Sequence, residues 1–367
     1  MKVAFVTGSR ADWNGLGMVA KAFKADGRFD VAVVVTGQHL EAGTSDLIWN
    51  DGFARHDVRL GRKGDAPLDI AKAVGTGVAG LAGRLATLNP DLVVLAGDRY
   101  ETLSAATAAA VLGIPIAHIG GGDVTEGSMD DKFRNAVTMM ADIHFPTNDY
   151  SGDRIITMRG LGRTLVYAEG SPALDRIRET PVTVSKSEFC RLVEIDPSRK
   201  NILVAFHPVT TDADPAAQCR EMIEALRAVD AGIVVLGTNA DAGGEAVARL
   251  LSGLGVKPFQ NLSAPMFYAA LTHMDLMIGN SSAGIYETAS FGIPVVNVGN
   301  RQTGRITPDN VFNCPADAAQ IAAAIPFQMA GGHRPCRNPY GDGHSSPRIV
   351  KIIAEHFGVM HGATDRG

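Results

Sequence analysis

The chain has 367 residues, of which 46% are hydrophobic and 20% are charged, and its formal net charge is -5. This length suits about two domains, and the near-average composition excludes disordered and fibrous classes. The acidic balance argues against a nucleic-acid-binding protein, and no apolar run is long enough for a membrane helix. The first residues have the pattern of a short strand rather than a signal peptide, so we expect a cytoplasmic protein.

The cysteines are far apart and include no C-x-x-C pair, which argues against a zinc site and against a disulfide framework. We therefore expect free thiols, buried or half-buried, at Cys190, Cys219, Cys314 and Cys336.

The first half of the chain alternates short apolar runs with helical stretches. The runs lack polar alternation, which indicates strands buried on both faces, as in a parallel sheet. The expected strands are Val3–Thr7, Val31–Val35, Asp91–Leu95 and Ile114–Ile119, and the expected helices are Gly17–Ala25, Ile70–Leu88 and Glu101–Leu112.

The second half repeats this scheme. Its expected strands are Ile202–Phe206, Ile233–Leu236, Leu276–Gly279 and Val295–Val298, and its expected helices are Ala216–Val229, Glu245–Leu254, Pro265–Thr272 and Ile285–Phe291. A proline-punctuated charged segment, Ser171–Asp196, marks the boundary. We expect domains at 1–172 and 173–346, with a helix at Pro347–Phe357 as a candidate to cross back onto the first domain.

The predicted fold is therefore α/β, with two doubly wound Rossmann-like domains that face a cleft, as in the GT-B architecture. Ligands of open α/β sheets bind beyond the carboxyl ends of the strands, so candidate functional residues are those that follow strands.

Three loops of the first half carry such residues. Arg10 follows the first strand and could bind a phosphate, or could be a surface arginine beside a capped turn. Asp98 follows Asp91–Leu95 and is either functional or a helix cap. After Ile114–Ile119, the loop Gly120–Gly127 lets backbone approach a ligand and contains Asp123.

Other candidates of this half lie beside the glycine loop. His118 is either a core histidine or a residue facing the cleft. Asp130 and Arg134 are four residues apart on the next expected helix, so they share one face and could form an ion pair.

The second half offers a candidate anion site. His207 follows Ile202–Phe206, and Ser281 and Ser282 follow Leu276–Gly279 at the start of a helix. Glu287 lies about one turn further, where a carboxylate can accept both ribose hydroxyls. Arg301 follows the next strand. A serine cap and a structural histidine are the simpler interpretations. Together with the carboxylates of the first half, these residues suit a nucleotide-diphosphate sugar, a ligand that glycosyltransferases of this fold also use.

Eight short motifs between residue 2 and about 315 resemble, in this order, those of the hydrolysing UDP-N-acetylglucosamine 2-epimerases of sialic-acid and legionaminic-acid synthesis. They are Gly8–Asp12, Thr36–Leu40, Gly97–Glu101, Ala117–Asp123, Asp130–Arg134, His207–Thr210, Gly279–Glu287 and Gly299–Arg305.

The resemblance implies elimination of the nucleoside diphosphate to a 2-acetamidoglycal, followed by rehydration to the free 2-epimer. It implies no metal, no NAD and no other cofactor, and a homo-oligomer, dimer or tetramer. The catalytic carboxylates it implies are Asp98, Asp130 and Asp123. The substrate and nucleotide contacts it implies are Arg10, His39, Arg99, His118, Arg134, His207, Ser281, Ser282, Gly284, Glu287 and Arg301.

The chain departs from the sialic-acid pattern at two positions. Gly120 stands where a carboxylate is usual, and Asn135 stands where histidine is usual. These departures leave open which group is acid and which is base. They also leave open whether the sugar is N-acetylglucosamine or a diacetamido-trideoxyhexose, and whether the nucleotide is UDP or GDP. A glycosyltransferase and a non-catalytic nucleotide-sugar sensor are the alternatives.

Overall fold

The computed structural model describes residues 1–41, 43, 45–64, 66–124, 129–160, 164–209, 212–238, 243–259 and 262–359. The chain divides into two compact units. Unit 1 holds the described residues of 1–178 and 340–359, and unit 2 holds those of 179–339. The division falls at 178/179 and 339/340, where the sequence led us to expect 172/173 and 346/347.

Unit 1 is built on a parallel sheet with the strand order β3-β2-β1-β4-β5-β6-β7 within the described residues. The strands are β1 (Lys2–Thr7), β2 (Asp30–Thr36), β3 (Arg55–Val58), β4 (Leu92–Ala96), β5 (Ile116–Ile119), β6 (Ile143–Phe145) and β7 (Leu165–Val166). Val3 of β1 pairs with Val31 of β2 on one side and with Leu92 of β4 on the other. The order of the strands thus reverses between β1 and β4, which makes this the switch point of the sheet.

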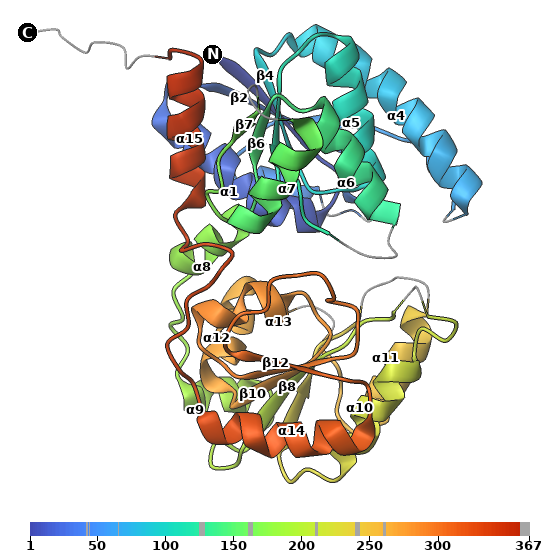
Figure 1. The fold of residues 1–367 in the computed structure, drawn as a ribbon, viewed down its shortest axis with the longest axis vertical. Helices are drawn as coiled ribbons and strands as arrows, with labels where there is room; N and C mark the ends of the chain where they lie inside the picture. Colours follow the sequence, from blue (N-terminus) through green and yellow to red (C-terminus); the bar gives the residue numbers. More distant parts are fainter. Residues whose placement is uncertain are drawn as a thin grey trace, which may run out of the picture. The chain divides into compact units, whose positions relative to one another are not determined.

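Helices cover both faces of this sheet (Figure 1). One face carries α1 (Arg10–Asp26) and α15 (Ser345–His356), and the other carries α4 (Pro67–Leu88), α5 (Tyr100–Val111) and α6 (Met129–Met140). The shorter helices of the unit are α2 (Gln38–Glu41), α3 (Asp46–Asn50), α7 (Asp149–Arg159), η1 (Pro172–Leu174) and α8 (Asp175–Glu179), the last of which ends at the division.

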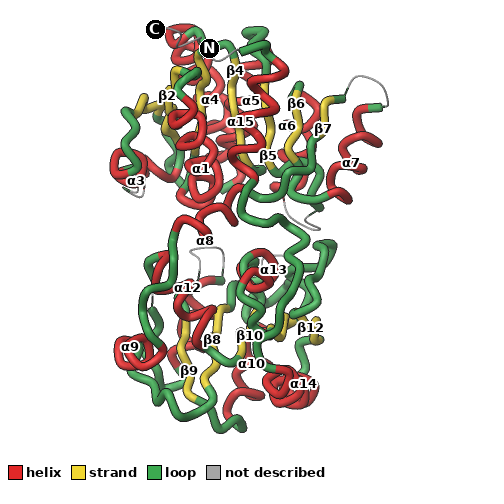
Figure 2. Tube along the Cα trace, turned by 90° about the vertical axis from the view of Figure 1, so that its left-hand side faces the viewer, coloured by secondary structure: helices red, strands yellow, loops and turns green. Residues whose placement is uncertain are grey.

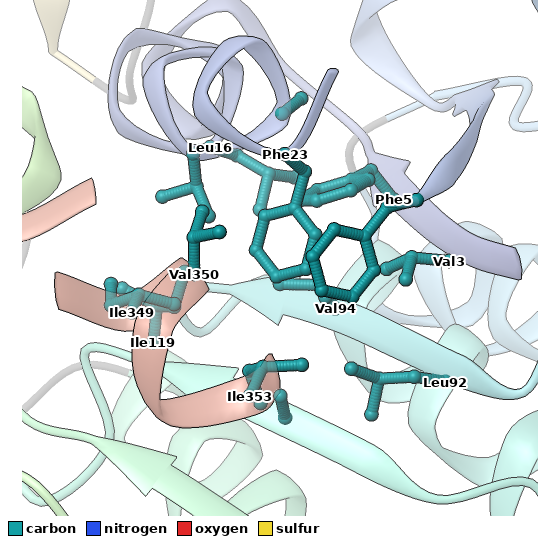
Figure 3. Packing of buried hydrophobic residues seen from close by; sticks show 14 of the residues in the cluster. Val3, Phe5, Leu16, Phe23, Leu92, Val94, Ile119, Ile349, Val350 and Ile353 are labelled. Atoms are coloured by element: carbon teal, nitrogen blue, oxygen red, sulfur yellow. The ribbon is translucent and has the colours of Figure 1, made fainter. Parts of the chain in front are cut away.

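The helix α15 returns to unit 1, as expected for the region of Pro347–Phe357. Its residues Ile349 and Ile353 are fully buried and pack with Phe5 of β1 in one cluster, which Figure 3 shows from close by. Asp175 holds the start of α15, because its carboxylate accepts hydrogen bonds from the backbone N–H groups of Ser345 at 2.9 Å and Ser346 at 2.6 Å.

Unit 2 contains a second parallel sheet, which Figure 2 shows with its helices. Its order over the described residues is β12-β11-β10-β8-β9, with the switch point between β8 and β10. The strands are β8 (Asn201–Ala205), β9 (Gly232–Val235), β10 (Leu276–Gly279), β11 (Val295–Val298) and β12 (Val311–Cys314). The helices are α9 (Lys186–Leu192), α10 (Ala217–Arg227), α11 (Gly244–Ser252), α12 (Ala264–His273), α13 (Ala283–Tyr286), η2 (Thr288–Ser290) and α14 (Ala318–Gly331). One apolar cluster joins α10, α11 and α14 to the strands.

Two expectations differ from the structure near candidate residues. Helix α1 begins at Arg10 rather than Gly17, because Ser9 caps it. The expected helix Ile285–Phe291 is instead the single turn of α13 followed by the 3₁₀ turn η2, so Glu287 lies between them. The free cysteines are confirmed: three are buried and Cys336 is half-buried. None of the helices in the described ranges combines the length and apolar character needed to cross a bilayer.

Candidate functional site

Unit 1 presents its polar side chains on the loops that follow β1 and β4, the strands at the switch point. The hydroxyl of Ser9 accepts a hydrogen bond from the backbone N–H of Asp12 at 3.3 Å and so begins α1. Arg10 is exposed in the first turn of this helix. An exposed guanidinium at a helix N-terminus, where backbone N–H groups also point outward, is well placed for an anion.

Arg99, after β4, is surrounded by carboxylates. Its Nε donates to Oε2 of Glu101 at 3.3 Å. Burial alone would lower the pKa of Arg99, but Glu101, Asp12 and a weaker contribution from Asp130 raise it. Burial raises the pKa of Asp12 to about 7, although Arg99 opposes this shift.

Glu101 joins the loops after three strands. Its side chain is only 1% exposed. A Cβ atom on Gly8 would lie 2.7 Å from the Cβ of Glu101, and one on Gly37 would lie 2.4 Å from its Oε1. Only glycine fits at these two positions, so the loops after β1 and β2 pack directly on this carboxylate.

His39 reinforces this packing at the end of β2. It is fully buried, and its Nε2 lies 3.1 Å from the hydroxyl of Thr7 at the end of β1. Its backbone N–H donates to the carbonyl of Gly8 at 3.1 Å. His39 therefore holds the loops after β1 and β2 together and does not lie on their outer surface.

Asp98 forms an ion pair with Arg134 of α6. Nη2 of Arg134 donates to Oδ2 of Asp98, and Nη1 donates to Oδ1 of Asp131 at 3.3 Å. The guanidinium is only 3% exposed, whereas the side chain of Asp98 is 28% exposed. A buried cation thus fixes a carboxylate that a ligand can still reach.

His118 lies fully buried at the end of β5. Its Nε2 is 2.8 Å from the carbonyl of Gly97, which can only accept, so Nε2 carries the proton. Nδ1 then accepts from the hydroxyl of Thr138 at 3.4 Å. Burial lowers the pKa of His118 to about 4, so the ring is neutral at physiological pH. The structure favours the core-histidine alternative, in which His118 holds the residue before Asp98.

The glycine loop after β5 is tied down by helix α7. The Oδ1 of Asp123 accepts hydrogen bonds from the hydroxyls of Ser151 at 2.6 Å and Thr147 at 3.4 Å. Nη1 of Arg134 donates to the backbone carbonyl of Asp123 at 2.8 Å. Arg154 of α7 donates to the carbonyls of Gly122 and Asp123, both at 3.1 Å. Residues Thr125–Gly127 of the loop lie outside the described residues.

The first turn of α6 carries the remaining carboxylates. Asp130 is exposed, and its charge acts on Arg99. Asp131 is the half-buried neighbour that pairs with Arg134. The Oδ2 of Asp131 also accepts a hydrogen bond from the side-chain amide of Asn135 at 2.9 Å.

In unit 2, Asn280 connects the loops at the switch point. It is fully buried after β10. Its Oδ1 accepts from the backbone N–H of His207 at 2.7 Å, and its Nδ2 donates to the carbonyl of His207 at 2.8 Å. Its own carbonyl accepts from Gln302 at 2.7 Å and from Arg301 at 3.2 Å. One side chain and its peptide thus fix the relative positions of three loop segments.

The residues after Asn280 form a single polar turn. The hydroxyl of Ser281 accepts from the backbone N–H of Ala283 at 3.4 Å, and Ser282 is exposed. Gly284 is buried within α13. Burial raises the pKa of Glu287 to about 7, against the opposing effect of its own backbone N–H and of Arg305.

The structure thus brings the sequence-predicted residues into two groups, one in each unit. Unit 1 holds Arg10, His39, Asp98, Arg99, His118, Asp123, Asp130 and Arg134. Unit 2 holds His207, Ser281, Ser282, Gly284, Glu287 and Arg301. Thr210, which ends the His207 motif, lies outside the described residues. Within the described residues, no group of three histidine, cysteine or acidic side chains is placed to hold a metal ion.

Sequence reasoning missed the residues that support these groups. Asp131, Ser151, Arg154, Asn280 and Gln302 all form hydrogen bonds within them. Asp131, Asn280 and Gln302 stood inside recognised motifs, which was a usable signal. Ser151 and Arg154 come from α7, which no motif marked.

Comparison with known proteins decides the family. The family described as UDP-N-acetylglucosamine 2-epimerase matches residues 21–354. The chain belongs to the UDP-N-acetylglucosamine 2-epimerase family.

Two curated relatives are similar over most of their length. One, from Legionella pneumophila, is named UDP-N,N'-diacetylbacillosamine 2-epimerase (hydrolyzing) and is 33% identical, with 98% of each chain covered. The other, from Campylobacter jejuni, is named GDP/UDP-N,N'-diacetylbacillosamine 2-epimerase (hydrolyzing) and is 26% identical, covering 85% of this chain and 84% of the relative.

A solved structure shares the fold. The crystal structure of UDP-GlcNAc 2-epimerase from Neisseria meningitidis, bound to UDP-GlcNAc, matches with a TM-score of 0.83 and 18% identity. The match covers 97% of this chain and all of the other. It identifies the architecture of two Rossmann-like units that the sequence predicted.

Proposed function

We propose that this chain is a hydrolysing 2-epimerase that converts a nucleotide-activated 2-acetamido sugar and water into a free 2-epimerised sugar and a nucleoside diphosphate. The observation that carries the proposal is the 33% identity, over 98% of each chain, to a relative named as such a hydrolysing epimerase. The names of the two curated relatives make a UDP- or GDP-linked N,N'-diacetylbacillosamine the first substrate to test. The ligand of the Neisseria meningitidis structure makes UDP-N-acetylglucosamine the second.

The reaction needs two proton-transfer groups and a site for the leaving group. A base takes the proton from C2, the bond from C1 to the diphosphate breaks, and its loss leaves a C1–C2 double bond. A proton then returns to C2 from the opposite face while water adds to C1. Carboxylates suit the proton transfers, and cations or N–H groups suit the departing diphosphate.

We assign the proton transfers to Asp98 and Asp130. Asp98 is partly exposed and oriented by Arg134, and Asp130 is exposed in the first turn of α6. Both properties suit contact with a sugar. Asp123 is the third candidate carboxylate. Its Oδ1 accepts hydrogen bonds from Ser151 and Thr147, which suits a residue that holds the glycine loop in place.

We assign the nucleotide to the polar turn of unit 2, and we keep Arg10 of unit 1 as a candidate for binding an anion. Ser281 and Ser282 offer hydroxyls for the diphosphate, with His207 and Arg301 held nearby by Asn280. Glu287 is assigned to the ribose hydroxyls. The raised pKa of its carboxyl group supports this assignment, because hydroxyl donors would stabilise the ionised form that burial disfavours.

A substrate panel tests the proposal. The chain is incubated with UDP-N,N'-diacetylbacillosamine, its GDP counterpart and UDP-N-acetylglucosamine, and proton NMR follows free sugar and nucleoside diphosphate. We expect both products from at least one of the three. Intact nucleotide sugar in all three samples would contradict the proposal. Binding without turnover would indicate the sensor alternative, and turnover only with an added acceptor would indicate a glycosyltransferase.

A further inference from the structure

We propose that Arg154 and Asn135 are positioning residues, which act through Arg134 to hold the carboxylate of Asp98 in its reactive orientation. The inference rests on the proposed function, because it assigns the pair a part in the 2-epimerase reaction. Neither residue is expected to contact the sugar. What they provide is a continuous chain of hydrogen bonds from helix α7 to the loop after β4.

The chain begins at Arg154 on α7. Its Nη1 donates to the carbonyls of Gly122 and Asp123, each at 3.1 Å, and to Oδ1 of Asn135 at 3.2 Å. One guanidinium nitrogen therefore joins the backbone of the glycine loop to the side chain of α6.

Asn135 carries the connection further along α6. Its Oδ1 accepts from Arg154, and its Nδ2 donates to Oδ2 of Asp131 at 2.9 Å. The amide has only one orientation that satisfies both neighbours, since the flipped amide would point N–H groups at a guanidinium and oxygen at a carboxylate. Arg154 thus fixes the amide, and the amide fixes Asp131.

Asp131 and the glycine loop both accept hydrogen bonds from Arg134. Its Nη1 donates to Oδ1 of Asp131 at 3.3 Å and to the carbonyl of Asp123 at 2.8 Å. The same guanidinium donates through Nη2 to Asp98. Because Arg134 is only 3% exposed, these protein groups determine where it lies, and Arg134 determines where the carboxylate of Asp98 points.

The amide at position 135 fits both of its neighbours. Asparagine presents one acceptor and one pair of donors in fixed directions, which matches a guanidinium on one side and a carboxylate on the other. Asn135 and Arg154 therefore act as one unit, and loss of either should release the same restraint.

The test is a double-mutant cycle on the full chain. The variants are Arg154→Met, which keeps the aliphatic stem without the donors, Asn135→Ala, and the two combined. Arg159→Met is the matched control, since Arg159 lies on the same helix, is half-buried like Arg154, and donates to the carbonyl of Met139 outside the chain of bonds. For each variant, kcat and KM are measured on the substrate found active, and the circular dichroism spectrum checks folding.

We expect each single variant to lower kcat about tenfold with little change in KM, and the double variant to be no worse than either. The control should keep its kcat. The inference would be overturned if kcat of the double variant fell by the product of the two single effects. An unchanged kcat in Arg154→Met, or an effect confined to KM, would also overturn it. A wild-type chain without activity would instead contradict the proposed function. Amide hydrogen exchange of Gly121–Val124, faster in Arg154→Met than in Arg159→Met, would then still support the restraint, and equal exchange would overturn it.

Discussion

Arg134 donates a hydrogen bond to the carboxylate of Asp98, although the two residues are 36 apart in the chain and stand on a helix and on a strand-end loop. The cation is buried and the carboxylate is partly exposed. The pair therefore leaves the carboxylate of Asp98 oriented and accessible, which suits the proton transfer that we propose for it.

Replacing Asp98 by asparagine should remove one of the two proposed proton-transfer groups and keep the shape of the side chain. We expect kcat to fall by about a hundredfold or more while nucleoside diphosphate binding is retained. Steady-state kinetics and calorimetric titration with UDP measure the two quantities. Asp153→Asn, on the exposed surface of α7, is the control and should leave both unchanged. Normal turnover in Asp98→Asn would remove Asp98 from the mechanism.

Two glycines of the loop after β5 should differ in their tolerance of alanine. Both have positive φ, which costs a side chain about 1–2 kcal/mol. A Cβ on Gly122 would also lie 2.2 Å from the backbone oxygen of Ser151, whereas one on Gly120 meets no atom within 4 Å. Urea unfolding should show Gly122→Ala to be the more destabilised by at least about 1 kcal/mol. Equal losses would contradict this packing.

His144 should make unit 1 sensitive to acid. It is fully buried on β6, neither ring nitrogen has a hydrogen-bond partner among the described residues, and burial lowers its pKa to about 3. Because the pKa is lower in the folded chain, the unfolded chain takes up a proton first as the pH falls. The free energy of unfolding is therefore at its full value above the unfolded pKa of 6.5 and decreases as the pH falls toward 3.

His144→Leu should therefore gain stability relative to wild type as the pH falls, by about 2 kcal/mol between pH 8 and pH 5. Denaturant unfolding at the two pH values measures the difference. His118, whose pKa is lowered to about 4, is unchanged in this variant and should leave part of the acid sensitivity. A difference that does not depend on pH would contradict the linkage.

Glu287 should couple nucleotide binding to pH. Its pKa is raised to about 7 by burial, and ribose hydroxyls would favour the ionised carboxylate. UDP affinity should therefore rise between pH 6 and pH 8, with proton release on binding, by up to about tenfold. The terminal phosphate of UDP titrates near pH 6 as well. Titrating Glu287→Gln with UDP over the same pH range isolates the contribution of the carboxylate. If UDP affinity of this variant depended on pH as it does in the wild-type chain, Glu287 would be removed from the ribose site.

The sequence predicted most of the strands that are buried on both faces, because continuous apolar runs such as β4 and β10 have few other interpretations. It missed β6, which is buried but only three residues long. It also missed β3, β7 and β12, which are short, partly exposed edge elements with little apolar signal. The start of α1 was placed seven residues late because its first turn is polar, although Ser9 and Asp12 carry a capping pattern.

Candidate site residues were predictable where they follow strands, since parallel strands bring their carboxyl ends to one edge. Residues that act at a distance from those ends were not. Arg154 belongs to a helix with no motif, and its contacts with Gly122 and Asn135 exist only in the folded chain. His118 was ambiguous in the sequence, and burial together with its bond to Gly97 favours the core interpretation.

The proposed elimination and rehydration can be tested most directly by running the reaction in deuterated water and reading C2 of the released sugar by NMR. The account predicts free sugar with inverted configuration and deuterium at C2, together with released nucleoside diphosphate. Free sugar that keeps its proton and its configuration at C2 would show simple hydrolysis at C1, and would contradict the central claim that this chain removes and replaces the C2 proton.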